Sequence, residues 1–166
     1  MKTKKITFVG IMTALAMVLS YVEMLLPPVW SAVPGVKVGL PNIIIIFIFY
    51  KLSFKEAMIV SLLRVIMISL LFGTVLSFCY SLSGAVLSLL VMLFLKKIDL
   101  FSMVGVSVAG GVFHNLGQIL AAMFLMQTKE IGYYMIVLAV TGIIAGIFVG
   151  LAGALCLKYS KRFKLM

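Results

Sequence analysis

The sequence predicts an all-α membrane protein, a single bundle of six transmembrane helices with both termini in the cytoplasm. Hydrophobic residues make up 64% of its 166 residues, and charged residues only 11%. No soluble domain of this size could bury so much apolar surface. Apolar runs of about 20 residues, the length that crosses the hydrocarbon core of a bilayer, recur along the chain. We therefore expect one transmembrane domain over residues 1–166, with no separate soluble domain.

We expect helices near residues 6–26, 38–51, 55–73, 75–96, 100–127 and 131–157. The first follows lysines, as a secretory signal does, but its apolar stretch is too long and no cleavage site follows, so we predict a retained helix. The second is short, with Pro41 near its start, where a missing N–H does least harm. Its β-branched run, Ile43–Ile46, should still be helical, because lipid offers the backbone no other partners.

The basic residues indicate the orientation of these helices. Eleven lysine or arginine residues fall on one side of the predicted bundle and two on the other: Lys2, Lys4, Lys5, Lys51, Lys55, Lys96, Lys97, Lys158, Lys161, Arg162 and Lys164, against Lys37 and Lys129. Cytoplasmic loops of membrane proteins carry such an excess, so both termini are expected in the cytoplasm. The net charge of +10 is thereby explained without a nucleic-acid partner.

The longest external connection, "PPVWSAVPGVK", spans residues 27–37 and contains Pro27, Pro28 and Pro34. Such a segment cannot be a helix. It is either an interfacial loop anchored by Trp30 or a lid over a binding site, because binding loops are often built this way. Both interpretations stay open from the sequence.

Small residues mark two kinds of helix contact. In the last helix Gly142, Gly146 and Gly150 recur every four residues, which favours close packing inside the bundle. The first helix has two small-residue faces, more than one neighbour within the chain needs. These faces, formed by Gly10 with Ala14 and by Ala16 with Ser20, are the predicted docking site for a partner protein.

Arg64 lies close to the centre of the third predicted span. A central arginine costs a few kcal/mol on insertion scales, roughly 2.5 to 3.5, so its side chain must face a partner or a wet cavity. It is either a buried structural arginine or part of a functional site. Acids are scarce, and only Glu23 could approach it from within the membrane, which favours a functional site.

The stretch "GGVFHNLGQIL" (residues 110–120) places three polar residues in an apolar helix. His114 and Gln118 are four residues apart and share one face, while Asn115 points about 100° away. With Arg64 and Asn42, and with Lys37 in the connection above, they could form a polar pocket with a positive bias. Such a pocket favours a ligand with a negative or acceptor-rich group on an apolar body.

Other polar residues carry weaker signals. Serines of the fourth predicted helix, Ser77, Ser81 and Ser88, recur at helical spacing and are more typical of helix packing than of ligand binding. No metal or other cofactor is expected, because one histidine and two separated cysteines supply too few ligands of suitable spacing.

The stretches "PGVKVGLPNI", "FKEAMIVSLLRVIMISLLFGT", "SFCYSLSGAVLSLLVM" and "GVSVAGGVFHNLGQ" together resemble the bacterial Gx transporter family, also labelled heptaprenyl diphosphate synthase component I. That family is similar in size and layout to the substrate-binding (S) components of energy-coupling factor transporters. The resemblance implies a place in the bacterial cytoplasmic membrane and a ligand pocket under the loop after the first helix. It also implies partners: a transmembrane coupling subunit, contacted by small residues of the first helix, and two cytoplasmic ATPases.

The leading functional hypothesis is therefore an S-component-like subunit that captures a small vitamin-like or isoprenoid-related solute. The alternative is an accessory membrane subunit of isoprenoid or quinone metabolism, associated with heptaprenyl diphosphate synthesis. A helical scaffold is a third possibility. We expect no enzyme activity, because prenyl transfer needs clustered carboxylates that hold Mg²⁺, and the chain has one aspartate.

Overall fold

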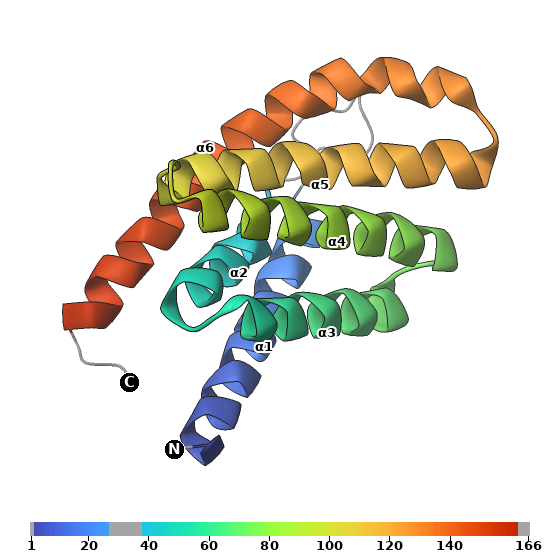
Figure 1. The fold of residues 1–166 in the computed structure, drawn as a ribbon. Helices are drawn as coiled ribbons and strands as arrows, with labels where there is room; N and C mark the ends of the chain where they lie inside the picture. The colour runs from blue at the N-terminus through green and yellow to red at the C-terminus, as the bar shows by residue number, and fades with distance from the viewer. Residues whose placement is uncertain (1, 27–37, 163–166) are drawn as a thin grey trace.

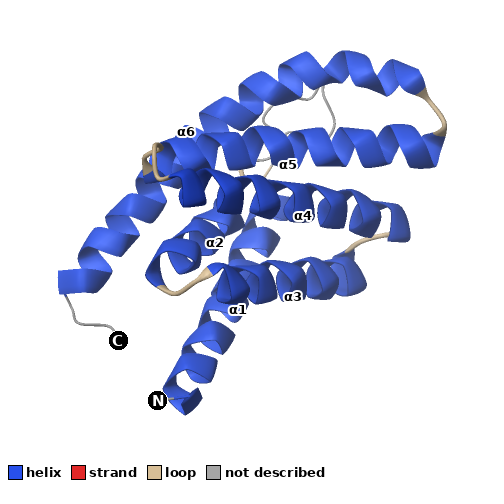
Figure 2. Ribbon diagram, in the orientation of Figure 1, coloured by secondary structure: helices blue, strands red, loops and turns tan. Residues whose placement is uncertain are grey.

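The computed structural model describes residues 2–26 and 38–162, which are almost entirely helical (Figure 1, Figure 2). Within these ranges no strand occurs. The helices are α1 (Lys2–Leu25), α2 (Leu40–Lys51), α3 (Phe54–Phe72), α4 (Val75–Ile98), α5 (Met103–Met126), the 3₁₀ helix η1 (Lys129–Tyr134) and α6 (Met135–Arg162). The all-α prediction is confirmed. The first helix begins earlier than expected, and a 3₁₀ turn precedes the last one.

Within residues 2–26 and 38–162, four helical stretches are long and apolar enough to cross a membrane: Thr3–Leu25, Val75–Ile98, Met103–Met126 and Lys129–Ser160. This supports a multi-pass membrane protein, although six such spans were expected. With 12 residues, α2 rises only about 18 Å, less than the ~30 Å thickness of the hydrocarbon core. Helix α3 has 19 residues and carries three charged side chains along its length.

Large apolar side chains cover the outside of the long helices. Ile6 on α1, Val75 and Phe94 on α4, Phe124 on α5 and Ile136 on α6 are all largely exposed. Monomeric soluble proteins rarely expose apolar area on this scale. The outer surface is therefore suited to lipid.

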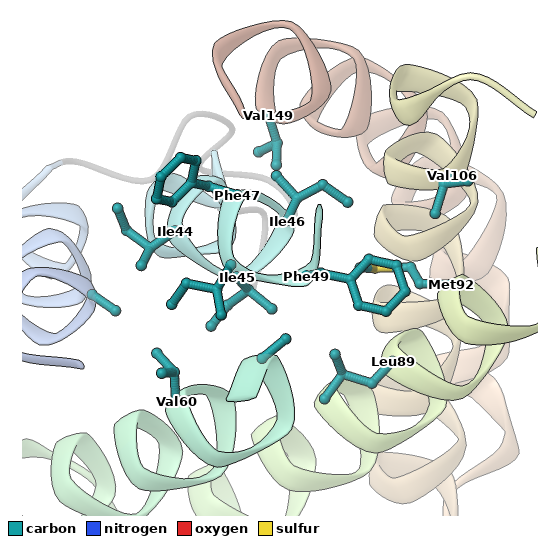
Figure 3. Packing of buried hydrophobic residues seen from close by; sticks show 13 residues of the cluster. Ile44, Ile45, Ile46, Phe47, Phe49, Val60, Leu89, Met92, Val106 and Val149 are labelled. Atoms are coloured by element: carbon teal, nitrogen blue, oxygen red, sulfur yellow. The ribbon is translucent and has the colours of Figure 1, made fainter. Parts of the chain in front are cut away.

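Helix α2 lies in the middle of the bundle and contacts α1, α3 and α6. Its residues from Ile44 to Phe49 are all buried. They form the main hydrophobic core with Val60 of α3, Leu89 and Met92 of α4, Val106 of α5 and Val149 of α6 (Figure 3). The isoleucine run is helical, as predicted, but Ile44, Ile45 and Ile46 are buried against protein.

Contacts between helix termini distinguish two ends of the bundle. At the lysine-rich end, Lys5 on α1 pairs with Glu56 in the first turn of α3 at 2.5 Å, and Lys96 on α4 reaches the last turn of α2. The opposite end holds the last turns of α1 and α3 and the first turns of α2 and α4. If lysines mark the cytoplasmic side, as the sequence predicts, the opposite end faces outward.

Charged side chains from neighbouring helices hold α2 at both ends. At its start, Glu23 Oε1 accepts the N–H of Gly39 and, at 3.3 Å, that of Leu40. Gly39 has φ +80°, which glycine adopts without strain. At its end, Lys96 Nζ donates to the Phe49 carbonyl at 2.6 Å and lies 4.2 Å from the centroid of that ring. Both charges satisfy otherwise unpaired backbone groups and oppose the helix dipole.

Glycines bring α5 close to its two neighbours. A Cβ added at Gly146 on α6 would lie 2.5 Å from the Val108 Cα of α5, and one at Gly142 would lie 3.0 Å from the Gly111 carbonyl oxygen. On the other side, a Cβ at Gly117 would lie 2.9 Å from the Gly84 Cα of α4. The prediction that the glycine stripe of the last helix packs inside the bundle is confirmed.

Candidate functional site

A polar cavity of about 120 Å³ lies at the opposite end of the bundle, and all six α-helices contribute to its lining. We call it the outer cavity. Five residues predicted to bind substrate line it: Asn42 of α2, Arg64 of α3 and His114, Asn115 and Gln118 of α5. Their spacing in the sequence could not show that they meet, and the helix packing brings them to one place.

Lys37 and the connection that contains it, residues 27–37, lie outside the described residues. The two interpretations of that connection therefore stay predictions, as does the role given to Lys37.

Arg64 projects from the middle of α3 toward α1. Its Nη1 lies 3.4 Å from the Ser20 hydroxyl oxygen, a long hydrogen bond, and that hydroxyl donates to the Ala16 carbonyl at 2.8 Å. The Arg64 Nε is shielded from solvent and has no hydrogen-bond partner among the described residues. A guanidinium carries five N–H donors, and one long hydrogen bond to Ser20 is what the described residues offer them.

Glu23, the acid expected to approach Arg64 from within the membrane, lines the same cavity. Within the described ranges, however, no ion pair joins it to Arg64. Its Oε1 binds the first N–H groups of α2 instead. The carboxylate is thus committed to a helix N-terminus, whose partial positive charge stabilises it, and it leaves Arg64 without a direct counter-ion.

The polar residues of α5 divide between the cavity and the neighbouring helix. His114 Nε2 and Gln118 Nε2 lie 3.3 Å apart, which confirms that they share a face. The Asn115 side chain donates to the Leu138 carbonyl at 2.6 Å, and Thr141 bonds the same carbonyl at 3.0 Å. Asn115 therefore ties α5 to α6 as well as lining the cavity.

A second cavity of about 40 Å³, the inner cavity, adjoins the first on the side of the lysine-rich end. It shares Asn42 and His114 with the outer cavity, and most of its other lining is apolar. The serines of α4 line these spaces: Ser77 and Ser81 the outer cavity and Ser88 the inner one. The expectation that these serines serve helix packing more than ligand binding stays a prediction.

The predicted docking residues of α1 separate into two groups. Gly10 and Ala14 are exposed, and a Cβ added at Gly10 would meet nothing within 4 Å. Ala16 and Ser20 are buried, because α2 and α3 pack against that face of α1. The second pair therefore cannot serve as an outer docking surface, and Ser20 belongs to the cavity instead.

The sequence predicts Ser20 in a docking surface and Glu23 only as a partner for Arg64. The signal that could have placed both in the site is their spacing of three residues on one membrane helix, which puts them on one face. Among the described residues, no three histidine, cysteine, aspartate or glutamate side chains gather where they could hold a metal ion.

The fold and the site together define a helical membrane protein with a small polar cavity between its helices. The family model described as heptaprenyl diphosphate synthase component I matches residues 12–156. The chain therefore belongs to that family. Comparisons with curated proteins and with solved structures found no match.

Proposed function

We propose that this chain is the substrate-binding membrane subunit of a bacterial importer of the energy-coupling factor type. It captures a small vitamin-like or isoprenoid-related solute in the outer cavity. The observation that carries the proposal is the convergence of Arg64, His114, Gln118 and Asn42 on one cavity. Polar groups within a membrane protein are expensive and mark sites of function.

The position of the cavity supports capture from outside. Its lining includes the last turns of α1 and α3 and the first turns of α2 and α4, away from the lysine-rich end. With the lysines in the cytoplasm, a solute would enter from the external side of a bacterial cytoplasmic membrane. Such an entry is what an importer needs.

Partners supply the energy in this proposal. The sequence contains no phosphate-binding glycine–lysine loop, so two cytoplasmic ATPases and a transmembrane coupling subunit would drive release. The exposed face of α1 around Gly10 and Ala14 is where the coupling subunit would dock, because small residues let another helix approach closely.

A mild-detergent pull-down of the tagged chain from its own host, followed by mass spectrometry, tests this proposal. Recovery of a coupling subunit with two ATPases supports it, and Gly10→Leu should lower that recovery at least about tenfold while leaving the unfolding temperature unchanged. A matched control is Val140→Leu, on an exposed part of α6, which should leave recovery unaltered. A prenyl synthase recovered without ATPases would refute the importer.

The family's description favours a second candidate, because "component I" names one part of a synthase with more than one component. In that case the chain is an accessory membrane subunit that holds a partner synthase or its prenyl substrate at the bilayer. The same pull-down distinguishes the two candidates. In neither does this chain perform the prenyl transfer, since its acids do not cluster into the carboxylate motif that binds Mg²⁺ for such chemistry.

A further inference from the structure

The two cavities lie along one line between the ends of the bundle. On α3, Arg64 lines the outer cavity and Ser61, one turn nearer the lysine-rich end, lines the inner one. On α4 the lining passes from Ser81 to Ala85, and on α6 from Gly142 to Gly146. A ligand in both cavities would therefore point one end outward and the other toward the lysine-rich end.

The walls of the two cavities differ in chemistry. Described residues of the inner cavity include Ile45, Ile46, Leu89 and Val149, all buried and apolar. A few hydroxyls interrupt this wall, and that of Ser88 already faces the Met92 sulfur at 3.7 Å. Such a space favours an apolar group over a charged one.

The outer cavity holds one charge without a direct counter-ion. Arg64 is the single lysine or arginine among its described lining residues. Its Nε is unpartnered there and its Nη1 makes one long bond. Glu23, at the same cavity, is already bound by two backbone N–H groups. A second negative charge on a ligand would meet the repulsion of this carboxylate and would find no second lysine or arginine among the described lining residues.

Accepting the proposed function of solute capture, we propose that the solute is a small monoanion of the carboxylate type. Its oxyanion binds the Arg64 guanidinium, whose planar N–H groups match a carboxylate. Its apolar body points into the inner cavity. The inner cavity, about 40 Å³, admits only the end of that body. With the outer cavity, about 120 Å³, it limits the solute to about one aromatic ring, since a cavity of about 150 Å³ holds benzene.

Three compounds that share one ring and carry a negative, a neutral or a positive polar group test this assignment. Phenylacetate, phenylethanol and phenethylamine are titrated into the full chain in an uncharged detergent, with geranyl diphosphate as a polyanionic prenyl probe. Phenylacetate should bind about 10- to 100-fold more tightly than phenylethanol, the gain of a charge-assisted hydrogen bond, and phenethylamine should bind most weakly. Geranyl diphosphate should bind more weakly than phenylacetate.

Three variants show which residues cause the preference for phenylacetate. Arg64→Met should reduce phenylacetate affinity to that of phenylethanol, with the folded state checked by thermal unfolding. Lys158→Met removes an exposed charge from the lysine-rich end and should leave phenylacetate affinity unchanged. Ala145→Val, which narrows the space where both cavities meet, should weaken phenylacetate and phenylethanol alike.

Several outcomes would overturn the assignment, and they separate it from the proposed function. If phenylacetate and phenylethanol bind equally well, the cavity does not select a negative charge and the monoanion is wrong. If Ala145→Val weakens both, the cavity still binds a solute, and the proposed function stands. Tighter, Arg64-dependent binding of geranyl diphosphate would overturn the monoanion and favour the synthase component. Failure of phenylacetate to bind also overturns the monoanion, while the importer itself is decided by the pull-down of its ATPases.

Discussion

Arg64 on α3 and Ser20 on α1 are joined by a hydrogen bond of 3.4 Å from the guanidinium to the hydroxyl oxygen. This is a weak anchor for a charge, because the bond is long and its acceptor is a neutral hydroxyl, which donates to the backbone of its own helix. The α1–α3 interface thus positions the arginine without neutralising it. A residue held in this way contributes little to the stability of the fold.

Replacing Arg64 should therefore weaken ligand binding without lowering the stability of the fold. Arg64→Met is expected to leave the free energy of unfolding unchanged or to raise it by up to about 2 kcal/mol, because an apolar side chain of similar length removes a poorly paired buried charge. Thermal unfolding of the purified chain measures this. A loss of more than about 1 kcal/mol would instead identify a structural arginine. Arg64→Lys, which keeps the charge but not the planar donor fork, should recover ligand binding only in part.

Glu23→Ala should destabilise the chain by about 1–3 kcal/mol, because it leaves the first N–H groups of α2 without their acceptor. Chemical denaturation in detergent followed by circular dichroism would measure the change. Glu130→Ala is the matched control, since Glu130 is exposed on η1 and its loss should change stability by less than about 0.5 kcal/mol. Equal effects of the two substitutions would rule out the capping role of Glu23.

Lys96 and its neighbour Lys97 should differ in how much they stabilise the fold. Lys96→Met removes both a bond to the last turn of α2 and a cation–π contact, so a loss of about 1–2 kcal/mol is expected. Lys97→Met removes the same charge at an exposed position and should cost less than about 0.5 kcal/mol. Parallel thermal unfolding of both variants makes the comparison. If the two lysines only set the orientation in the membrane, both substitutions should cause the same small change in stability.

Gly146→Ala should cost about 1–3 kcal/mol, because the new methyl group would press on the α5 backbone at Val108. Gly105→Ala, on α5, is its control, because its added Cβ would meet only ordinary contacts of 3.7 Å. It should be neutral or slightly stabilising, because alanine favours a helix. The unfolding temperatures of the two variants would show the difference, and a neutral Gly146→Ala would mean that α5 and α6 can move apart.

The helices could be predicted from the sequence because apolar runs of this length have few alternatives. The burial of α2 could not be predicted. The run Ile43–Ile46 is equally apolar whether it faces lipid or protein, so composition cannot distinguish the two. The shortness of the helix was visible, but its central position depends on which neighbours surround it.

Part of the candidate site could be predicted from the sequence. Arg64, His114 and Gln118 stand out because polar groups in a membrane helix need an explanation. Ser20 did not stand out, because a serine in a membrane helix is equally compatible with close helix packing and with a binding site. The meeting of α1, α3 and α5 around one cavity depends on packing angles, which the pattern of residues does not encode.

The short, enclosed α2 has a consequence for how the protein is made. A 12-residue segment is a poor candidate for independent entry into the bilayer during synthesis, whereas α1 qualifies by length and apolarity. The groups that satisfy both ends of α2, Glu23 before it and Lys96 far after it, come from helices made at different times. We therefore expect α2 to reach its final position only once α4 has emerged from the ribosome, although α2 comes second in the chain.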